Sequence, residues 1–292
     1  MPHRTARRLL PFLCLLVFAG AASASSSKGV PRLIFPVVGD VRYTDDFGQP
    51  RAGGAHQGND LMAAKKSPAV AVEAGKVKFW TTSANAGCML YLYGDSGTTY
   101  LYIHLNNDLT IKNDNRGKCA PGTAYAPDLK SGARVAAGQL VGFVGDSGDA
   151  DGIASHLHFE VHPDGGAAVS PFPYLRKAQH LLFYAKPAST VSLVLTAKVL
   201  TNAGGLLDVK LSKLQVLPSK QTLVVSQRLV LGTATNVEVA LTDVLPSLGR
   251  LALSDVKSGV PVTIYTAPTK ATIEAQRGDD DVFVASKIVL GG

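Results

Sequence analysis

Two short stretches of the sequence carry side chains of the kinds that bind divalent metal ions. The tripeptide His156-Leu157-His158 lies in an apolar run typical of a β-strand, in which successive side chains alternate between two faces. Both imidazoles would then project from one face, with an apolar layer behind them. The pentapeptide His56-Gln57-Gly58-Asn59-Asp60 places an imidazole and a carboxylate four residues apart, with Gly58 permitting a bend.

Imidazole nitrogen and carboxylate oxygen are both ordinary ligands of zinc. A catalytic zinc site usually keeps three protein ligands and leaves one position open for water. The two stretches together offer four candidate groups, so the residues alone leave open which three of them bind.

A third stretch, Tyr100-Leu101-Tyr102-Ile103-His104, contributes another imidazole. Strand alternation predicts that His104 shares a face with Tyr100 and Tyr102, while the residues between them pack behind. A histidine beside a metal-bound water can hold or move a proton. A single histidine on a strand is more often a core or surface residue, so the metal hypothesis depends on all three stretches together.

Signatures of other hydrolases are absent or weak. The sequence contains neither His-Glu-x-x-His nor Gly-x-Ser-x-Gly. Three further short motifs are interpreted as turns, because each is rich in glycine, proline or aspartate. They are Gly145-Asp146-Ser147-Gly148, His162-Pro163-Asp164-Gly165 and Arg277-Gly278-Asp279.

The three stretches and their flanks resemble the signature segments of the lysostaphin-type (LytM-type) zinc endopeptidases. The matching segments are His56-Gln57-Gly58-Asn59-Asp60, Tyr102-Ile103-His104-Leu105 and His156-Leu157-His158-Phe159-Glu160, in the order of the family. Phe47-Gly48-Gln49-Pro50-Arg51, which precedes the first segment, is similar too. The resemblance covers about residues 33–180.

This resemblance implies a role for each residue of the three segments. His56, Asp60 and His158 would bind one zinc ion per chain. His104 and His156 would be catalytic: they would orient or deprotonate the zinc-bound water and stabilise the charged tetrahedral intermediate. The substrate would be the stem or cross-link peptides of bacterial peptidoglycan.

The sequence also departs from the family pattern. Residues 106–130 form a longer polar insertion than a minimal member needs, and we expect it to make one wall of the substrate groove. Gly53-Gly54-Ala55 suggests a mobile opposite wall. The C-terminal part does not resemble the aromatic-rich Src-homology-3-like modules that often accompany these enzymes.

Two alternative functions stay open at this point. One is a non-catalytic protein of the same fold that binds cell wall or activates another hydrolase. The other is a zinc endopeptidase that acts on Gly-rich proteins outside the wall.

The elements that must position these residues are short strands. From Leu33 to about Tyr184, apolar runs of four to eight residues alternate with Gly-rich turns. This pattern predicts an all-β chain, with an antiparallel sheet and an open groove in a zinc endopeptidase domain over residues 33–185. Residues 186–190 are interpreted as a linker. Residues 191–292 hold no His, Cys or Trp and are rich in Val, Leu and Thr, which predicts a β-rich, sandwich-like accessory domain of unknown role.

The chain of 292 residues has a formal net charge of +7, of which Arg4, Arg7 and Arg8 supply three. These arginines precede an apolar run and the small residues Ala22-Ser23-Ala24, as in a secretory signal peptide over residues 1–24. Residues 25–32 would be a flexible leader. The apolar run is shorter than a bilayer needs, so we expect a secreted protein (periplasmic, cell-wall or extracellular) without stable membrane insertion.

The remaining positive charge does not favour nucleic acid as a partner, since no dense Lys/Arg run is interleaved with aromatics. Beyond the leader, Cys88 and Cys119 are the two cysteines of the chain. In an oxidising compartment they should form one disulfide, which would contribute roughly 3–4 kcal/mol to stability. Two free buried thiols are the alternative, and the oligomeric state is not readable from the sequence.

Overall fold

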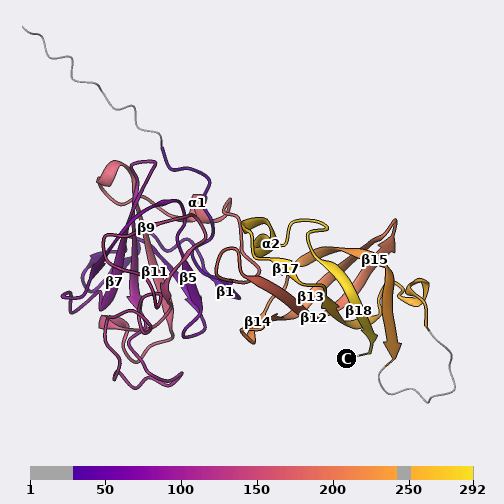
Figure 1. Cartoon of the computed structure of the whole chain (residues 1–292). Helices are drawn as coiled ribbons and strands as arrows, with labels where there is room; N and C mark the ends of the chain where they lie inside the picture. Colours follow the sequence, from indigo (N-terminus) through magenta and orange to yellow (C-terminus); the bar gives the residue numbers. More distant parts are fainter. Residues whose placement is uncertain (1–28, 242–250, 292) are drawn as a thin grey trace, which may run out of the picture.

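The computed structural model describes residues 29–241 and 251–291, which are mostly strands and turns (Figure 1). In these residues the α-helices are α1 (Phe172–Leu175) and α2 (Ile273–Arg277). The prediction of an all-β chain is confirmed. The strands fall into two groups that lie side by side in Figure 1, one on each side of residues 181–189.

The first group is built on an open, antiparallel sheet of seven strands. Its order is β1 (Val41–Arg42), β4 (Asn59–Ala63), β11 (His156–His162), β8 (Thr99–Leu105), β7 (Cys88–Gly94), β6 (Gly75–Trp80) and β9 (Arg134–Val135). Two smaller sheets accompany it: β5 (Pro68–Val70) with β10 (Leu140–Phe143), and the hairpin of β2 (Pro50–Arg51) and β3 (Gly54–Ala55).

Alternation along β11 gives this sheet one apolar and one polar face. Leu157, Phe159 and Val161 are fully buried in the core, together with residues of β5 and β10. The residues between them, His156, His158 and Glu160, project from the other face. Burial of the apolar face fixes the register, because a one-residue slip would exchange the two faces.

Strand β8 departs from the alternation that the sequence predicts. Tyr100 and Tyr102 lie in the core, and Ile103 pairs with His158 on the polar face, so the predicted grouping of His104 with the two tyrosines is wrong. The register shifts between β7 and β8 at this point, and His104 has a left-handed backbone with φ 61°. Such an irregularity turns a side chain to the opposite face, which brings His104 to the polar side.

The second group closes on itself as a barrel. The sheet order is β14 (Gln221–Val224), β13 (Leu206–Leu217), β15 (Arg228–Leu241), β18 (Val284–Leu290), β16 (Pro261–Thr266), β12 (Thr190–Ala203) and β17 (Thr269–Lys270). Because β12 also pairs with β13, five of these strands form a ring around an apolar core. The β-rich character expected for residues 191–292 thus takes the form of this ring, in which β15 and β18 run parallel.

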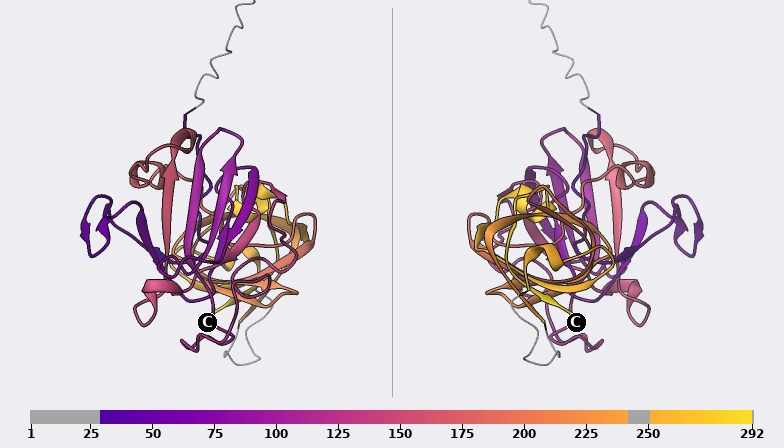
Figure 2. Two further views of the ribbon diagram at one scale, coloured as in Figure 1. Left: turned by 90° about the vertical axis from the view of Figure 1, so that its left-hand side faces the viewer. Right: turned by 90° about the vertical axis from the view of Figure 1, so that its right-hand side faces the viewer.

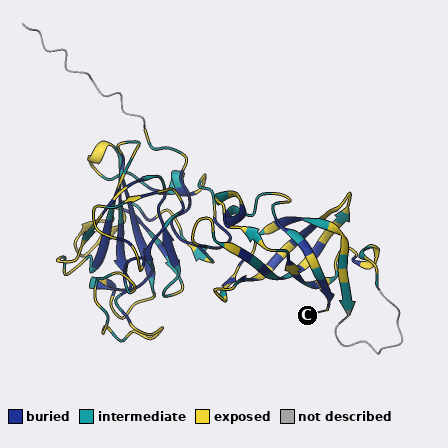
Figure 3. Ribbon diagram, viewed as in Figure 1, coloured by how far each residue is buried: buried dark blue, intermediate teal, exposed yellow. Residues whose placement is uncertain are grey.

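The two groups share an apolar contact. Leu181, Leu182 and Phe183 belong to the same buried cluster as the core of the barrel. The backbone N–H of Leu182 donates to the carbonyl of Gln276 in α2 over 2.7 Å, and that of Ala185 donates to the Gln276 side chain over 2.9 Å. Figure 3 shows buried residues on both sides of this junction.

The polar face of the large sheet looks away from the barrel. The left-hand view of Figure 2 shows the sheet in front and the barrel behind it. The small sheet of β5 and β10 lies between them, since Val70 is buried with the barrel residues and Ala69 with the large sheet. Among the described residues, those that line the cleft on this face all come from the first group.

The predicted signal peptide (1–24) and residues 25–28 of the predicted leader lie outside the described residues. Val30 of that leader packs partly against the core of the first group. No helix in the described ranges is long and apolar enough to cross a bilayer.

Candidate metal centre

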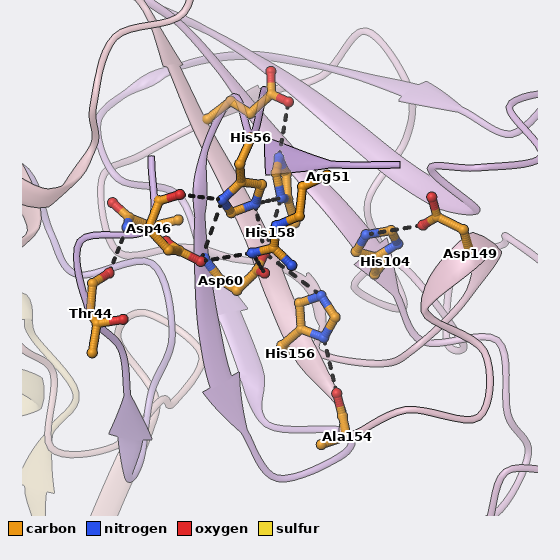
Figure 4. A network of polar contacts seen from close by, with 12 residues as sticks. Thr44, Asp46, Arg51, His56, Asp60, His104, Asp149, Ala154, His156 and His158 are labelled. Atoms are coloured by element: carbon orange, nitrogen blue, oxygen red, sulfur yellow. Dashed lines mark hydrogen bonds and ion pairs between the residues drawn. The ribbon is translucent and has the colours of Figure 1, made fainter. Parts of the chain in front are cut away.

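Three candidate metal ligands converge at the polar face of the large sheet (Figure 4). His56 Nε2 lies 2.9 Å from His158 Nδ1 and 3.1 Å from Asp60 Oδ1, and the last two atoms are 3.1 Å apart. Among the described residues, this is the one cluster of three His, Cys, Asp or Glu side chains with the spacing of a metal site. The structure thus brings together the three residues that the family resemblance assigns to zinc.

Strand pairing explains why two of these side chains meet. His158 on β11 lies directly opposite Asp60 on β4 in the antiparallel register, and such pairs have neighbouring side chains on one face. Gly58 allows the close approach of the chain to β11. A Cβ atom there would lie 2.4 Å from the carbonyl oxygen of Phe159 and 2.8 Å from His158 Nε2. Lack of space, in addition to any bend, therefore requires glycine at this position.

Each imidazole of the triangle is oriented through its second nitrogen. His56 Nδ1 is 2.9 Å from the backbone carbonyl of Asp46, and His158 Nε2 is 3.0 Å from Glu160 Oε1. Since a carbonyl or carboxylate accepts only from an N–H, the other nitrogen of each ring is free to bind a metal. Arg51 Nη2 donates to Asp60 Oδ2 over 3.0 Å, which leaves Oδ1 facing the two rings.

Glu160 links the triangle to a further histidine. Its Oε2 atom lies 2.6 Å from Nε2 of His162, whose Nδ1 is 2.9 Å from the carbonyl of Gly166. His162 belongs to the segment that the sequence analysis interpreted as a turn, and it stands at the end of β11 before that turn. It supports the carboxylate that orients His158.

Two carboxylates hold a proton on the buried imidazole between them in the metal-free protein. Burial lowers the pKa of His158, but its hydrogen bonds to Asp60 and Glu160 outweigh burial and raise this pKa to about 9. Burial raises the pKa of Glu160, and the hydrogen bonds from His158 and His162 reverse the effect and bring it to about 2. For Asp60, burial is likewise outweighed by its hydrogen bond to His158 and by the neighbouring imidazoles, so that its pKa lies well below the usual range.

His104 and His156 lie beside the triangle without joining it (Figure 4). Their ring centroids are 5.0 Å apart, and the centroid of His104 is 6.0 Å from that of His158. His104 Nδ1 is 2.8 Å from the carbonyl of Ser147, and His156 Nδ1 is 3.0 Å from that of Ala154. The Nε2 atom of His104 is left available as a proton acceptor, whereas Nε2 of His156 faces Asp60 Oδ1 at 3.8 Å.

His104 is neutral at pH 7. Burial, together with repulsion from His156, lowers its pKa to about 4. Asp149 is the nearest carboxylate to its Nε2 atom, at 3.7 Å, but is largely exposed and offsets burial only weakly.

All five residues line one cleft of about 400 Å³. One wall is the β2–β3 hairpin, including Gly53, Gly54 and Ala55. The other wall is formed by Asn85, Ala86 and the segment from Asp149 to Ile153.

The insertion at residues 106–130 does not line the cleft, contrary to expectation. It lies against the outer wall instead, where Asn113 and Asn115 donate to Asp151 Oδ1 over 2.6 and 2.9 Å. The structure contains the Cys88–Cys119 disulfide, which ties this insertion to β7. The insertion is polar and exposed over much of its length, so most of its backbone stays in contact with water. Its contacts with the wall and with β7 hold it in place.

Three residues of the site were not singled out in the sequence. Glu160 could have been found, because alternation along the strand places its side chain on the same face as those of His156 and His158. Asp46 contacts His56 Nδ1 through its backbone carbonyl, which carries no sequence signal, and its carboxylate lies 3.4 Å from the same atom. Arg51 reaches the site from a hairpin whose placement depends on tertiary contacts.

No protein-family model matches the sequence. An L-Ala–D-Glu endopeptidase of Bacillus subtilis is 26% identical over 152 residues, which are 48% of this chain and 41% of that protein. The chain therefore spans about two fifths of the length of this curated relative.

The lysostaphin-type (LytM-type) resemblance of residues 33–180 is confirmed. The chain is also similar in sequence to two solved structures. A putative glycyl-glycine endopeptidase of Ruminococcus gnavus is 26% identical, with 50% of this chain and 59% of that chain covered, at a TM-score of 0.39. The catalytic domain of lysostaphin from Staphylococcus simulans is 26% identical, with 47% and 92% covered, at a TM-score of 0.36.

Proposed function

We propose that the protein is an exported zinc endopeptidase that hydrolyses peptide bonds in the stem or cross-link peptides of bacterial peptidoglycan. The observation that carries this proposal is the convergence of His56, Asp60 and His158 on one point, in a cleft with two more imidazoles. The similarity to an L-Ala–D-Glu endopeptidase supports a peptide as substrate.

The three side chains suit zinc in kind and in spacing. Zinc binds imidazole and carboxylate at about 2.0–2.2 Å, so tetrahedral ligand atoms lie about 3.3 Å apart. The three ligand atoms are separated by 2.9–3.1 Å in the structure. A small outward shift would make room for the ion, and the hydrogen bonds to Asp46 and Glu160 would keep both rings in the required orientation.

When bound there, zinc would lower the pKa of a coordinated water toward about 7 and polarise the scissile carbonyl. The neutral His104 is the group best suited to accept a proton from the attacking water, because its free Nε2 lines the cleft. His156, from the strand that also carries His158, would donate a hydrogen bond to the developing oxyanion. The apolar side chains of Ile103 and Ile153 would exclude water around the scissile bond.

A pair of isosteric substitutions tests this proposal. Asp60→Asn should lower zinc affinity more than about 100-fold and abolish release of new amino groups from purified peptidoglycan, because the amide cannot supply the negative ligand. Asp164→Asn is the matched control, since Asp164 is exposed in a turn and has a left-handed backbone that Asn tolerates. Metal content by atomic emission and fragment mass spectrometry give the two readouts.

The alternatives predict other outcomes. A wild-type protein that binds peptidoglycan but releases no fragments would be a wall-binding or hydrolase-activating protein. Cleavage of Gly-rich proteins without cleavage of peptidoglycan would indicate a substrate outside the wall. An Asp60→Asn protein with wild-type zinc content and activity would contradict the proposed metal centre.

A further inference from the structure

An aromatic strip lies on the outer face of β6 and β7. We define it as Trp80, Tyr91 and Tyr93. Trp80 and Tyr93 are 40% and 42% exposed, while Tyr91 lies half-buried between them. The ring centroid of Tyr91 is 6.1 Å from that of Trp80 and 6.0 Å from that of Tyr93. The three rings therefore form a continuous apolar surface in contact with solvent.

The strip shares a sheet face with the candidate metal centre. On β7 the residues between the tyrosines, such as Leu92, are fully buried in the core, so the tyrosines point the opposite way. Leu101 of β8 pairs with Tyr91 on one side and with Glu160 of β11 on the other. With strands about 4.8 Å apart, Tyr91 is about 10 Å across the sheet from Glu160. One extended polymer could contact both places.

The solvent-exposed faces of these rings are not covered by other side chains of the described residues. Groups of exposed aromatic side chains usually mark binding surfaces. In the described part of the chain, the Trp80 indole N–H and the phenol groups of Tyr91 and Tyr93 form no hydrogen bond with the protein. The rings thus offer apolar faces and free polar edges at the same time.

We propose that the aromatic strip binds the glycan strand of peptidoglycan, with N-acetylated sugar rings stacked on Trp80 and Tyr93. The inference rests on the proposed function, because the glycan is the backbone to which the peptide substrate is attached. The C–H face of a pyranose ring packs against an aromatic face by dispersion. Sugar hydroxyl and N-acetyl groups would pair with the free phenol and indole groups.

Charge favours a sugar polymer over a nucleic acid at this strip. Lys78 Nζ sits over the Trp80 ring, 5.5 Å from its centroid. Arg134, on the neighbouring strand β9, is bound by both carboxylate oxygens of Asp95 over 2.6 and 2.9 Å. Lys76 and Lys78 of β6 lie on this face opposite Tyr93 and Tyr91. Two lysines are few for a phosphate backbone, whereas a neutral glycan needs none.

A peptide is a poorer fit to the strip. Extended peptides gain affinity by adding to a free sheet edge. The strands of the strip are paired on both sides, β7 with β6 and β8, and β6 with β7 and β9. Strand β9 covers β6 only at Gly75 and Lys76, but further along this edge the Phe79 N–H donates to Ser131 Oγ. The strip thus offers rings and little free backbone, which suits a ring-shaped ligand.

Trp80 is the one tryptophan of the chain, so its fluorescence reports on the strip alone. Titration of the wild-type protein with the peptide-free hexamer of N-acetylglucosamine should shift or quench this fluorescence at saturating sugar. Tyr93→Ala should weaken the binding about tenfold, because one stacked ring is lost. Tyr265→Ala is the matched control, since Tyr265 is 39% exposed on the barrel, and it should leave the titration unchanged.

Activity assays separate this inference from the proposed function. Trp80→Ala should raise KM for intact peptidoglycan about tenfold and leave cleavage of a glycan-free stem peptide unchanged, while Trp80→Phe restores the KM. If wild-type and Trp80→Ala proteins cleave both substrates equally, the strip has no such role and the peptidase proposal stands. If the wild type cleaves neither substrate but its fluorescence responds to the sugar, the glycan site stands and the peptidase proposal fails. A response to oligothymidylate and none to the sugar would overturn the inference.

Discussion

The large open sheet and the barrel are both β-structures, but they place their polar residues differently. The sheet has one apolar face on the core and one polar face, over which loops and a hairpin rise as walls. In the barrel, the apolar side chains fill a closed interior and the polar side chains radiate outward. Polar groups can converge on a walled sheet face, whereas on a convex barrel surface they diverge.

Buried polar residues follow the same division. Among the described residues, the first group buries histidines, aspartates, asparagines and Glu160, mostly around the cleft and its walls. The barrel buries only Asp208 and Thr266, with Gln276 at the contact between the groups. Because burial of polar groups is unfavourable unless they are paired, their concentration at one face indicates where this protein has its chemistry.

The largest effect is expected from adding a methyl group at the polar face of the sheet, where the candidate metal ligands converge. Gly58→Ala should abolish zinc binding and activity, because its Cβ would meet the Phe159 carbonyl and the His158 ring. Gly53→Ala is the control, since Gly53 lies in the hairpin wall of the cleft with no atom within 4 Å of an added Cβ. Zinc affinity by competition with a chelator dye measures both. Equal affinities for the two variants would show that the site does not need this close approach.

A smaller effect is expected from the carboxylate that orients His158. Glu160→Gln should reduce zinc affinity about 10- to 100-fold, as is usual when the partner of a metal-bound histidine is changed. Glu238→Gln makes the same chemical change on the barrel, where Glu238 forms an exposed ion pair with Lys287, and zinc affinity should not change. If Glu160→Gln binds zinc as the wild type does, Glu160 does not position His158.

The smallest effect concerns pH and stability. His180 stacks on Phe35, with ring centroids 4.2 Å apart, and burial lowers its pKa. The unfolded chain then binds more protons than the folded one just below pH 6.5. The contribution of His180 is therefore complete above about pH 6.5 and is lost as pH falls toward the lower folded-state pKa.

Thermal unfolding monitored by Trp80 fluorescence measures this contribution in the metal-free protein. Between pH 7.5 and pH 5, lowering the pH should reduce the Tm of the wild type by a few degrees relative to that of His180→Phe, which lacks the titrating ring. The barrel sequence from residue 191 onward contains no histidine. A pH dependence unchanged in His180→Phe would assign the effect to other groups of the sheet.

Local sequence patterns were sufficient for much of the site and the fold. Alternation in His156-Leu157-His158 placed two imidazoles on one face, and the structure agrees. The count of two cysteines beyond the leader was sufficient for the disulfide. These features depend on strand periodicity and composition, which are read from neighbouring residues.

Other features depended on contacts between distant residues. The irregular pairing of β7 and β8 turns His104 to the polar face, against the alternation of its own strand. The backbone carbonyl of Asp46 orients His56. Every residue has such a carbonyl, so the amino-acid type at this position does not predict the contact. Closure of the barrel required β12 to pair with both β13 and β16.

The sequence by itself determined which residues carry metal-binding chemistry and which strands are half-buried, because side-chain type and period are local properties. Only the tertiary structure decided how those residues meet and which nitrogen of each imidazole forms a hydrogen bond with the protein. It also decided that the insertion supports a wall of the cleft. Register, bulges and sheet closure are set by pairing between segments far apart in the chain. The sequence of one segment therefore does not predict which segment it pairs with.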